Sequence, residues 1–238
     1  MDKIPLILLP GTLCDATLFD YQLKHLADFT QAQVVDVHLQ DNLGDVAQYV
    51  LSQVEGRFAV AGLSYGGIVA FEVWRQAPER ILKLALLNTN PYPASEQTIK
   101  SQLRFITTAK SITLRKLAIQ YLEPVILHPN PQKDKVLREK VLDMANTIGV
   151  EGFINELRAQ LYRPSAITDL PHINCPTLVL TGREDLIVPL FAHEQMVENL
   201  PNSQLVIVEN CGHLSAIEQP EIVTQALKDW LTDAGSWE

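Results

Sequence analysis

Cysteine is scarce in this chain of 238 residues, which contains only Cys14, Cys175 and Cys211. The three are odd in number and widely spaced, and neither a C-x-x-C nor an H-E-x-x-H pattern occurs. Disulfide frameworks and zinc sites depend on such patterns. We therefore expect free thiols in a reducing compartment, no metal site and no cofactor.

Long apolar runs and an excess of basic residues are also missing. The run at residues 6–9 ends at Pro10-Gly11 and is too short for a signal-peptide core or a membrane span. The formal net charge is −9, whereas a nucleic-acid-binding protein needs a basic footprint. We therefore expect a cytoplasmic protein without nucleic-acid or membrane partners, and the sequence leaves its oligomeric state open.

Segments typical of strands alternate with segments typical of helices at both ends of the chain. Buried strands are expected at 4–9, 34–37, 58–61, 82–87, 177–181 and 204–208. Such alternation predicts an α/β fold, with a mostly parallel sheet of about six strands and helices on both faces.

The strand pattern disappears between Pro91 and Pro176. Apolar residues there recur at helical spacing in four stretches, near 95–109, 113–122, 133–148 and 150–162. Helices inserted between two strands of a parallel sheet predict a lid over its C-terminal edge. We expect a core formed by residues 1–90 and 171–238, and a helical lid formed by residues 91–170.

The most specific motif is Gly62-Leu63-Ser64-Tyr65-Gly66, which matches the pattern G-x-S-x-G between a buried strand and a helix. In such a turn the serine is exposed at the end of the strand, and the glycines prevent clashes between neighbouring backbones. The amides of the following helix favour developing negative charge. Ser64 is the predicted nucleophile; the alternative is a glycine-rich turn without chemistry.

A serine nucleophile needs a base, and the chain has six histidines. Only His213 lies in a loop after the last expected strand, at the sheet edge where Ser64 is also expected. The third member should be an acid that orients the imidazole. Asp185 follows the strand at 177–181. The order Ser64, Asp185, His213 is the one expected for a serine triad on an α/β fold with a parallel sheet.

Two other acids are candidates for the third position. Glu184 and Glu209 are the rivals of Asp185. The second common location for this acid, after the strand at 82–87, carries Asn88 and Asn90 instead. Because no acid stands at that location, Asp185 is favoured as the third member of the triad.

Together with Pro10-Gly11 and G-x-S-x-G-G, the segments PTLVLTGREDLIVP and CGHLSAIEQPE resemble the α/β-hydrolase superfamily, particularly its lidded small-molecule esterases and enol-lactonases. The resemblance covers residues 4–90 and 176–233. It implies an oxyanion hole made by two backbone amides, one from Tyr65 and one from the loop after the first strand. The family usually has His-Gly there; with Pro10-Gly11-Thr12, Thr12 becomes the expected donor and Leu13 the alternative.

Charge is distributed unevenly along the chain. Residues 95–170 contain eleven Lys or Arg and eight Asp or Glu, a net charge of +3, which leaves −12 for the rest. A basic lid favours a small-molecule substrate that carries a carboxylate. The candidate substrate contacts are Leu13 and a clamp from Arg104, Arg158 or Arg163; the alternative is a solvated lid face.

These residues predict a hydrolase that cleaves a small carboxylic ester or lactone through an acyl-enzyme. Relatives with the same triad also hydrolyse carbon–carbon bonds or eliminate pyruvate, so that chemistry is the second hypothesis. A third hypothesis, from another class, is a ligand receptor that keeps the fold without turnover.

Overall fold

The computed structural model describes residues 3–122, 126–128 and 134–232. The remaining residues of the predicted core and lid lie outside this description. Six strands form one sheet in the order β2-β1-β3-β4-β5-β6, and every neighbouring pair is parallel. The predicted fold class is therefore confirmed. The strands are β1 (Ile4–Leu9), β2 (Thr30–Val34), β3 (Phe58–Leu63), β4 (Ile81–Leu87), β5 (Thr177–Gly182) and β6 (Ser203–Val208).

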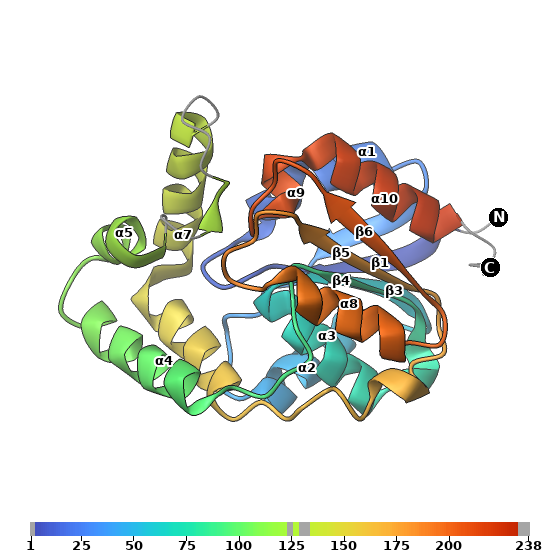
Figure 1. The fold of residues 1–238 in the computed structure, drawn as a ribbon, viewed down its shortest axis with the longest axis horizontal. Coiled ribbons are helices and arrows are strands. Elements are labelled where there is room, and N and C mark those ends of the chain that lie inside the picture. The colour runs from blue at the N-terminus through green and yellow to red at the C-terminus, as the bar shows by residue number, and fades with distance from the viewer. Residues whose placement is uncertain (1–2, 123–125, 129–133, 233–238) are drawn as a thin grey trace.

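Helices cover both faces of the sheet (Figure 1). One face packs against α2 (Leu43–Ser52), α3 (Tyr65–Gln76) and α8 (Leu190–Asn199). The other packs against α1 (Asp20–Leu26), α9 (Ser215–Glu218) and α10 (Pro220–Thr232). Because side chains alternate along a strand, each central strand contributes apolar side chains to both cores, and its sequence is mostly apolar.

Local sequence signals explain where several helices begin. The Asn42 side chain accepts a hydrogen bond from the Gly44 amide at 2.9 Å and caps α2. Asp15 caps the short 3-10 helix η1 (Ala16–Phe19) that precedes α1. No helix in the described part of the chain is long and apolar enough to cross a bilayer.

Between β4 and β5 the chain forms a group of helices to the left of the sheet in Figure 1. This helical insertion contains α4 (Glu96–Ala109), α5 (Leu114–Leu117), η3 (Ala118–Leu122, a π-helix) and α7 (Asp134–Leu161). It has an apolar core of its own. Among the described buried residues of that core, Leu13 alone comes from outside residues 91–170.

The helix α7 changes direction at Gly149, whose φ of 71° and ψ of 171° are not helical. The two helical stretches predicted at 133–148 and 150–162 correspond to its two arms. Backbone angles of this kind are open almost only to glycine. A single residue thus sets the direction of the second arm, which faces the sheet.

Candidate active site

Ser64 lies in a strained turn between β3 and α3. Its φ of 56° is positive and its ψ is −114°, so a non-glycine residue occupies a backbone region that is rarely populated. The neighbouring glycines permit this turn. A Cβ on Gly62 would lie 2.2 Å from the Gly66 carbonyl oxygen, and one on Gly66 would lie 2.0 Å from that of Leu9.

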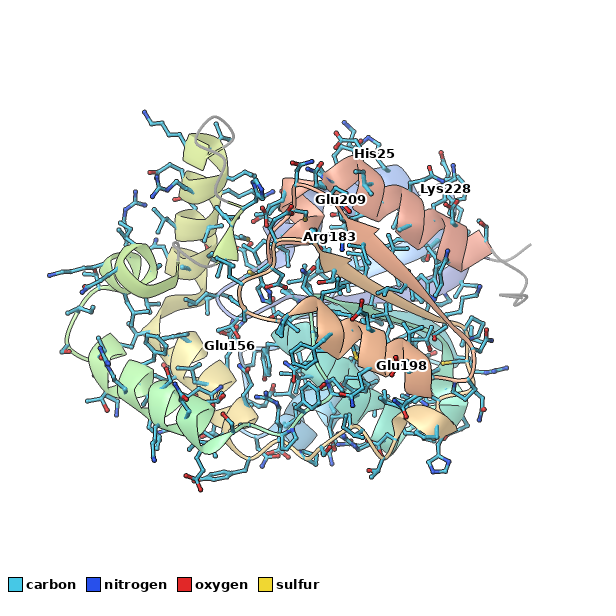
Figure 2. All side chains as sticks on the ribbon, viewed as in Figure 1. His25, Glu156, Arg183, Glu198, Glu209 and Lys228 are labelled. Atoms are coloured by element: carbon cyan, nitrogen blue, oxygen red, sulfur yellow. The ribbon has the colours of Figure 1, made fainter. Side chains whose placement is uncertain are left out.

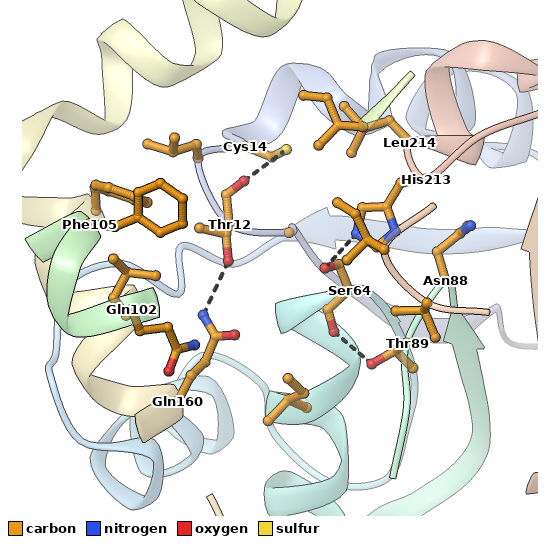
Figure 3. Close-up of a pocket in the computed structure, with 18 of the residues that line it drawn as sticks. Thr12, Cys14, Ser64, Asn88, Thr89, Gln102, Phe105, Gln160, His213 and Leu214 are labelled. Carbon is orange, nitrogen blue, oxygen red and sulfur yellow. Dashed lines mark hydrogen bonds between the residues drawn. The ribbon is translucent and has the colours of Figure 1, made fainter. Parts of the chain in front are cut away.

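The three residues of the predicted triad meet at the carboxyl ends of β3, β5 and β6. His213 Nε2 lies 2.8 Å from Ser64 Oγ, and His213 Nδ1 lies 2.8 Å from Asp185 Oδ2 (Figure 3 shows Ser64 and His213). Asp185 and His213 are buried, whereas Ser64 is partly accessible. When three side chains are hydrogen-bonded in this order, the carboxylate can orient the imidazole, and the imidazole can accept the proton of the serine.

Both oxygens of Asp185 are bound. Oδ1 accepts the amides of Ile187 at 2.8 Å and Val188 at 3.0 Å, and Oδ2 also accepts Asn88 Nδ2 at 2.9 Å. Burial by itself would raise the pKa of Asp185, but the opposing effects of His213, Asn88 and the Val188 amide leave it below its ordinary value. The acid is therefore held as a carboxylate.

The rival acids make other contacts. Glu184 accepts the Cys211 amide at 2.9 Å, and the exposed Glu209 pairs with Arg183 at 2.7 Å on the surface (Figure 2). The geometry therefore brings Asp185, and neither glutamate, to His213.

A second buried carboxyl group fixes the loop that carries His213. Glu218 accepts the amides of Gly212 and Leu214, each at 3.0 Å, and that of His128 at 2.7 Å. Burial raises the pKa of Glu218 in spite of these three donors. The His213 amide itself donates to the Ile126 carbonyl at 3.1 Å, so a segment of the insertion also contacts this loop.

The amides expected to form the oxyanion hole are those of Tyr65 and Thr12. They differ from the Leu13 amide in whether they already donate a hydrogen bond. Among the described residues, the amides of Tyr65 and Thr12 have no hydrogen-bond partner, whereas the Leu13 amide donates to Glu156 Oε2 at 2.9 Å. This difference favours Thr12 over Leu13 as the second donor of an oxyanion hole.

Ser64 and His213 line a cavity of about 340 Å³ between the sheet and the insertion (Figure 3). Its volume is in the range of small-molecule sites. Leu13 lines this cavity, and so does the buried thiol of Cys14. Burial is the main cause that raises the pKa of that thiol, which makes it a poor nucleophile.

The structure separates the three candidate arginines. Arg163 lines the cavity, whereas Arg104 and Arg158 do not. Arg104 is exposed on α4, and Arg158 pairs with Asp41 at 3.1 Å on the surface. The Arg163 Nε donates to the Tyr92 carbonyl at 2.9 Å, but among the described residues its terminal nitrogens have no partner.

Four residues around the site were missed in the sequence: Asn88, Glu156, Gln160 and Glu218. In the sequence, Asn88 indicates only that no acid follows β4, although an amide at that strand end can bind the acid of the next strand. Glu156 and Gln160 lie at helical spacing on the apolar face of Phe153 and Leu157, and polar residues on such a face are a signal in themselves. Glu218 had no signal beyond its place in the quoted segment.

The chain belongs to the alpha/beta hydrolase family, since a profile of that family matches residues 6–226. It is similar to a pimeloyl-[acyl-carrier protein] methyl ester esterase from Nitrosomonas europaea, with 25% identity over 76% of this chain and 74% of that protein. A putative carbamate hydrolase from Serratia proteamaculans is 27% identical, over 81% of this chain and 72% of that protein. The relatives support a hydrolase of this fold.

Two solved structures have the same architecture. A thermophilic esterase from Thermogutta terrifontis, with malate bound, has a TM-score of 0.89 and 27% identity over 98% of this chain and 91% of that one. An enol-lactonase from Burkholderia xenovorans has a TM-score of 0.85, and the match covers 98% of this chain and 93% of that one. At 19% identity this second likeness concerns the fold alone.

Proposed function

We propose that this protein is a serine hydrolase that cleaves a small carboxylic ester or lactone through an acyl-enzyme. The observation that carries the proposal is the hydrogen-bonded chain from Ser64 through His213 to Asp185 at the wall of a cavity. The similarity to esterases supports it.

Each proposed residue has one role in the reaction. Ser64 Oγ attacks the carbonyl carbon while His213 Nε2 accepts its proton, and the Tyr65 and Thr12 amides stabilise the oxyanion. The bond to the leaving oxygen then breaks, and His213 returns the proton to it. Water next attacks the acyl-enzyme with His213 again as base, and the carboxylic acid leaves.

We further propose that residues 91–170 act as a lid and that Arg163 binds a carboxylate on the substrate. A guanidinium with free terminal nitrogens can bind a carboxylate through two parallel hydrogen bonds. Burial lowers the pKa of Arg163, and a bound carboxylate would oppose that shift. The polar residues Asn90, Thr98 and Ser101 line the same cavity.

Labelling with a fluorophosphonate and hydrolysis of p-nitrophenyl esters test the proposal together. We expect the wild type to be labelled and active, and Ser64→Ala to remain folded, unlabelled and slower in kcat by several orders of magnitude, because the covalent route is lost. If Ser64→Ala kept more than roughly a tenth of the wild-type rate, Ser64 would not be the nucleophile. A ligand receptor with an inert site would stay unlabelled in both forms.

A further inference from the structure

The second arm of α7 carries a buried carboxyl group that the proposed reaction does not use. Glu156 is 0% exposed and lies on the side of α7 that faces the sheet (Figure 2). Its Oε2 accepts the Leu13 amide at 2.9 Å, and its Oε1 has no partner among the described residues. A buried acid without a cation costs free energy, so a compensating role is expected.

Leu13 is the residue through which the insertion holds the loop after β1. Its φ of 61° is positive, which is unusual for a side chain of this size. The Leu13 side chain packs in the apolar core of the insertion, and the Cys14 amide closes the turn on the Gly11 carbonyl at 3.1 Å. The strained turn is thus fixed from the insertion side through both the amide and the side chain of Leu13.

Gln160 adds a second connection one helical turn later. Its Nε2 donates to Thr12 Oγ1 at 3.1 Å, as Figure 3 shows, and to the Glu156 carbonyl at 3.0 Å. Thr12 and Leu13, which follow one another in the turn, are therefore bound by residues of the same face of α7.

We propose that Glu156 is a positioning residue for the oxyanion hole: it holds the Leu13 amide so that the adjacent Thr12 amide remains directed at the substrate's carbonyl oxygen. This inference rests on the proposed function, because the hole is needed only if Ser64 attacks a carbonyl. Glu156 acts through Leu13 and does not contact the substrate.

The surroundings of Glu156 favour its neutral form. Burial raises its pKa to about 8, and the Leu13 amide opposes this shift. Cys14 and Tyr65 face it from the loop and from α3, and both stay neutral because burial, and then Glu156 itself, raise their pKa values. His38 packs against Gly152, one turn earlier on α7, and Arg158 is paired with Asp41 at the surface.

A proton on Glu156 should therefore control the hole. Below pH 8 the acid is mostly neutral, and its Oε2 accepts the Leu13 amide hydrogen bond without adding a charge beside the loop. As the pH rises through about 8, a negative charge forms beside the loop on which a second negative charge must develop. Activity should fall in that range because the transition state is destabilised.

The test compares the pH dependence of p-nitrophenyl butyrate hydrolysis in Glu156→Gln, Glu156→Leu and the wild type, from pH 6.5 to 9.5. We expect wild-type kcat to fall by at least about tenfold above pH 8, because a negative charge on Glu156 disfavours the developing oxyanion. Glu156→Gln keeps an acceptor for Leu13, so it should retain the neutral-pH rate without the alkaline fall. Glu156→Leu should lower kcat at every pH, with KM little changed.

The matched control is Glu151→Gln, an exposed acid on the same arm, which should keep the wild-type profile. Stability gives a second readout. The folded state retains a proton that the unfolded chain releases, so wild-type stability should decrease between pH 4.5 and 8, and Glu156→Gln should lack this decrease.

Two results would overturn the inference: an unchanged alkaline fall in Glu156→Gln, or wild-type kcat in Glu156→Leu. Fluorophosphonate labelling of the wild type separates this failure from failure of the proposed function. A wild type that is labelled and active while the Glu156 variants behave like it refutes the positioning role alone. An unlabelled, inactive wild type refutes both.

Discussion

At the scale of single residues, Asp185 differs from the other acids near His213 in how completely it is bound. Its two oxygens accept one side-chain amide, two backbone amides and the imidazole. Asn88, which provides the side-chain amide, also donates to the Gly212 carbonyl at 3.2 Å. One asparagine therefore connects the acid to the loop that carries the base.

Asp185→Asn should lower kcat by about ten-thousandfold, because an amide can stabilise the wrong tautomer of His213. Glu184→Gln and Glu209→Gln are the matched controls and should have small effects, since neither side chain contacts the imidazole. The measurement is kcat for a p-nitrophenyl ester, with thermal unfolding to verify the fold. Equal losses in all three variants would show that the acid was assigned wrongly.

At the scale of elements, the conformation of Gly149 determines where the second arm of α7 points. Gly149→Ala should destabilise the protein by roughly 1–3 kcal/mol, because alanine is strained at these angles. It should also lower kcat/KM, since Phe153, Leu157 and Gln160 of that arm line the cavity.

Gly56→Ala is the control for this prediction. Gly56 also has a positive φ, 67°, and, as at Gly149, an added Cβ would meet no atom within 4 Å. It does not line the cavity. Both variants should therefore unfold at lower temperature, but only Gly149→Ala should lose activity. If neither lost activity, strain at residue 149 would not reach the cavity.

The strands could be predicted to the extent that burial on both faces makes them apolar. The central strands β1, β3, β4 and β5 were found within a few residues. The edge strand β2 was wrongly expected at 34–37, whereas it occupies Thr30–Val34. Buried and more exposed residues alternate along β2, and its exposed residues are polar, so the strand has no apolar run. The apolar residues Val35 and Val37 are buried, but they lie in the loop after the strand.

The candidate site was predictable where chemistry depends on order along the chain. The turn at Ser64 and the loops after β5 and β6 follow from the parallel sheet, which gathers the ends of its strands at one edge. The contacts of Glu156, Gln160 and Asn88 join segments far apart in sequence. They depend on how the insertion packs, and no local pattern contains that information.

At the scale of the whole molecule, the surface charges and the cavity suggest how a substrate is selected. The net charge of −9 repels anions in general, while the insertion between residues 95 and 170 is positive by +3. Arg163 is the arginine of the three candidates that reaches the cavity. Selection of a carboxylate should therefore depend on a short-range contact more than on long-range attraction.

Arg163→Met should lower kcat/KM for carboxylate-bearing esters by about tenfold to a hundredfold, which corresponds to the free energy of one charge-assisted hydrogen bond. The kcat/KM for neutral esters should remain nearly unchanged. Arg104→Met and Arg158→Met should treat both substrates as the wild type does. Raising the salt concentration from 0.1 M to 1 M shortens screening from about 10 Å to about 3 Å and should reduce the wild-type preference only partly. If Arg163→Met lost both substrates equally, the carboxylate contact would be refuted.

The packing of Leu13 into the insertion has a consequence for exchanging parts between related proteins. An insertion that lies between two strands and has its own core resembles a cassette, which could be replaced to change the substrate while the triad stays in place. In this protein Leu13, which belongs to the rest of the chain, packs in the core of the insertion, and its amide needs a hydrogen-bond acceptor in the insertion. A transplanted insertion would have to bring a cavity for that leucine and a buried acceptor at the place of Glu156. Without them, a chimera should fold and bind yet turn over slowly.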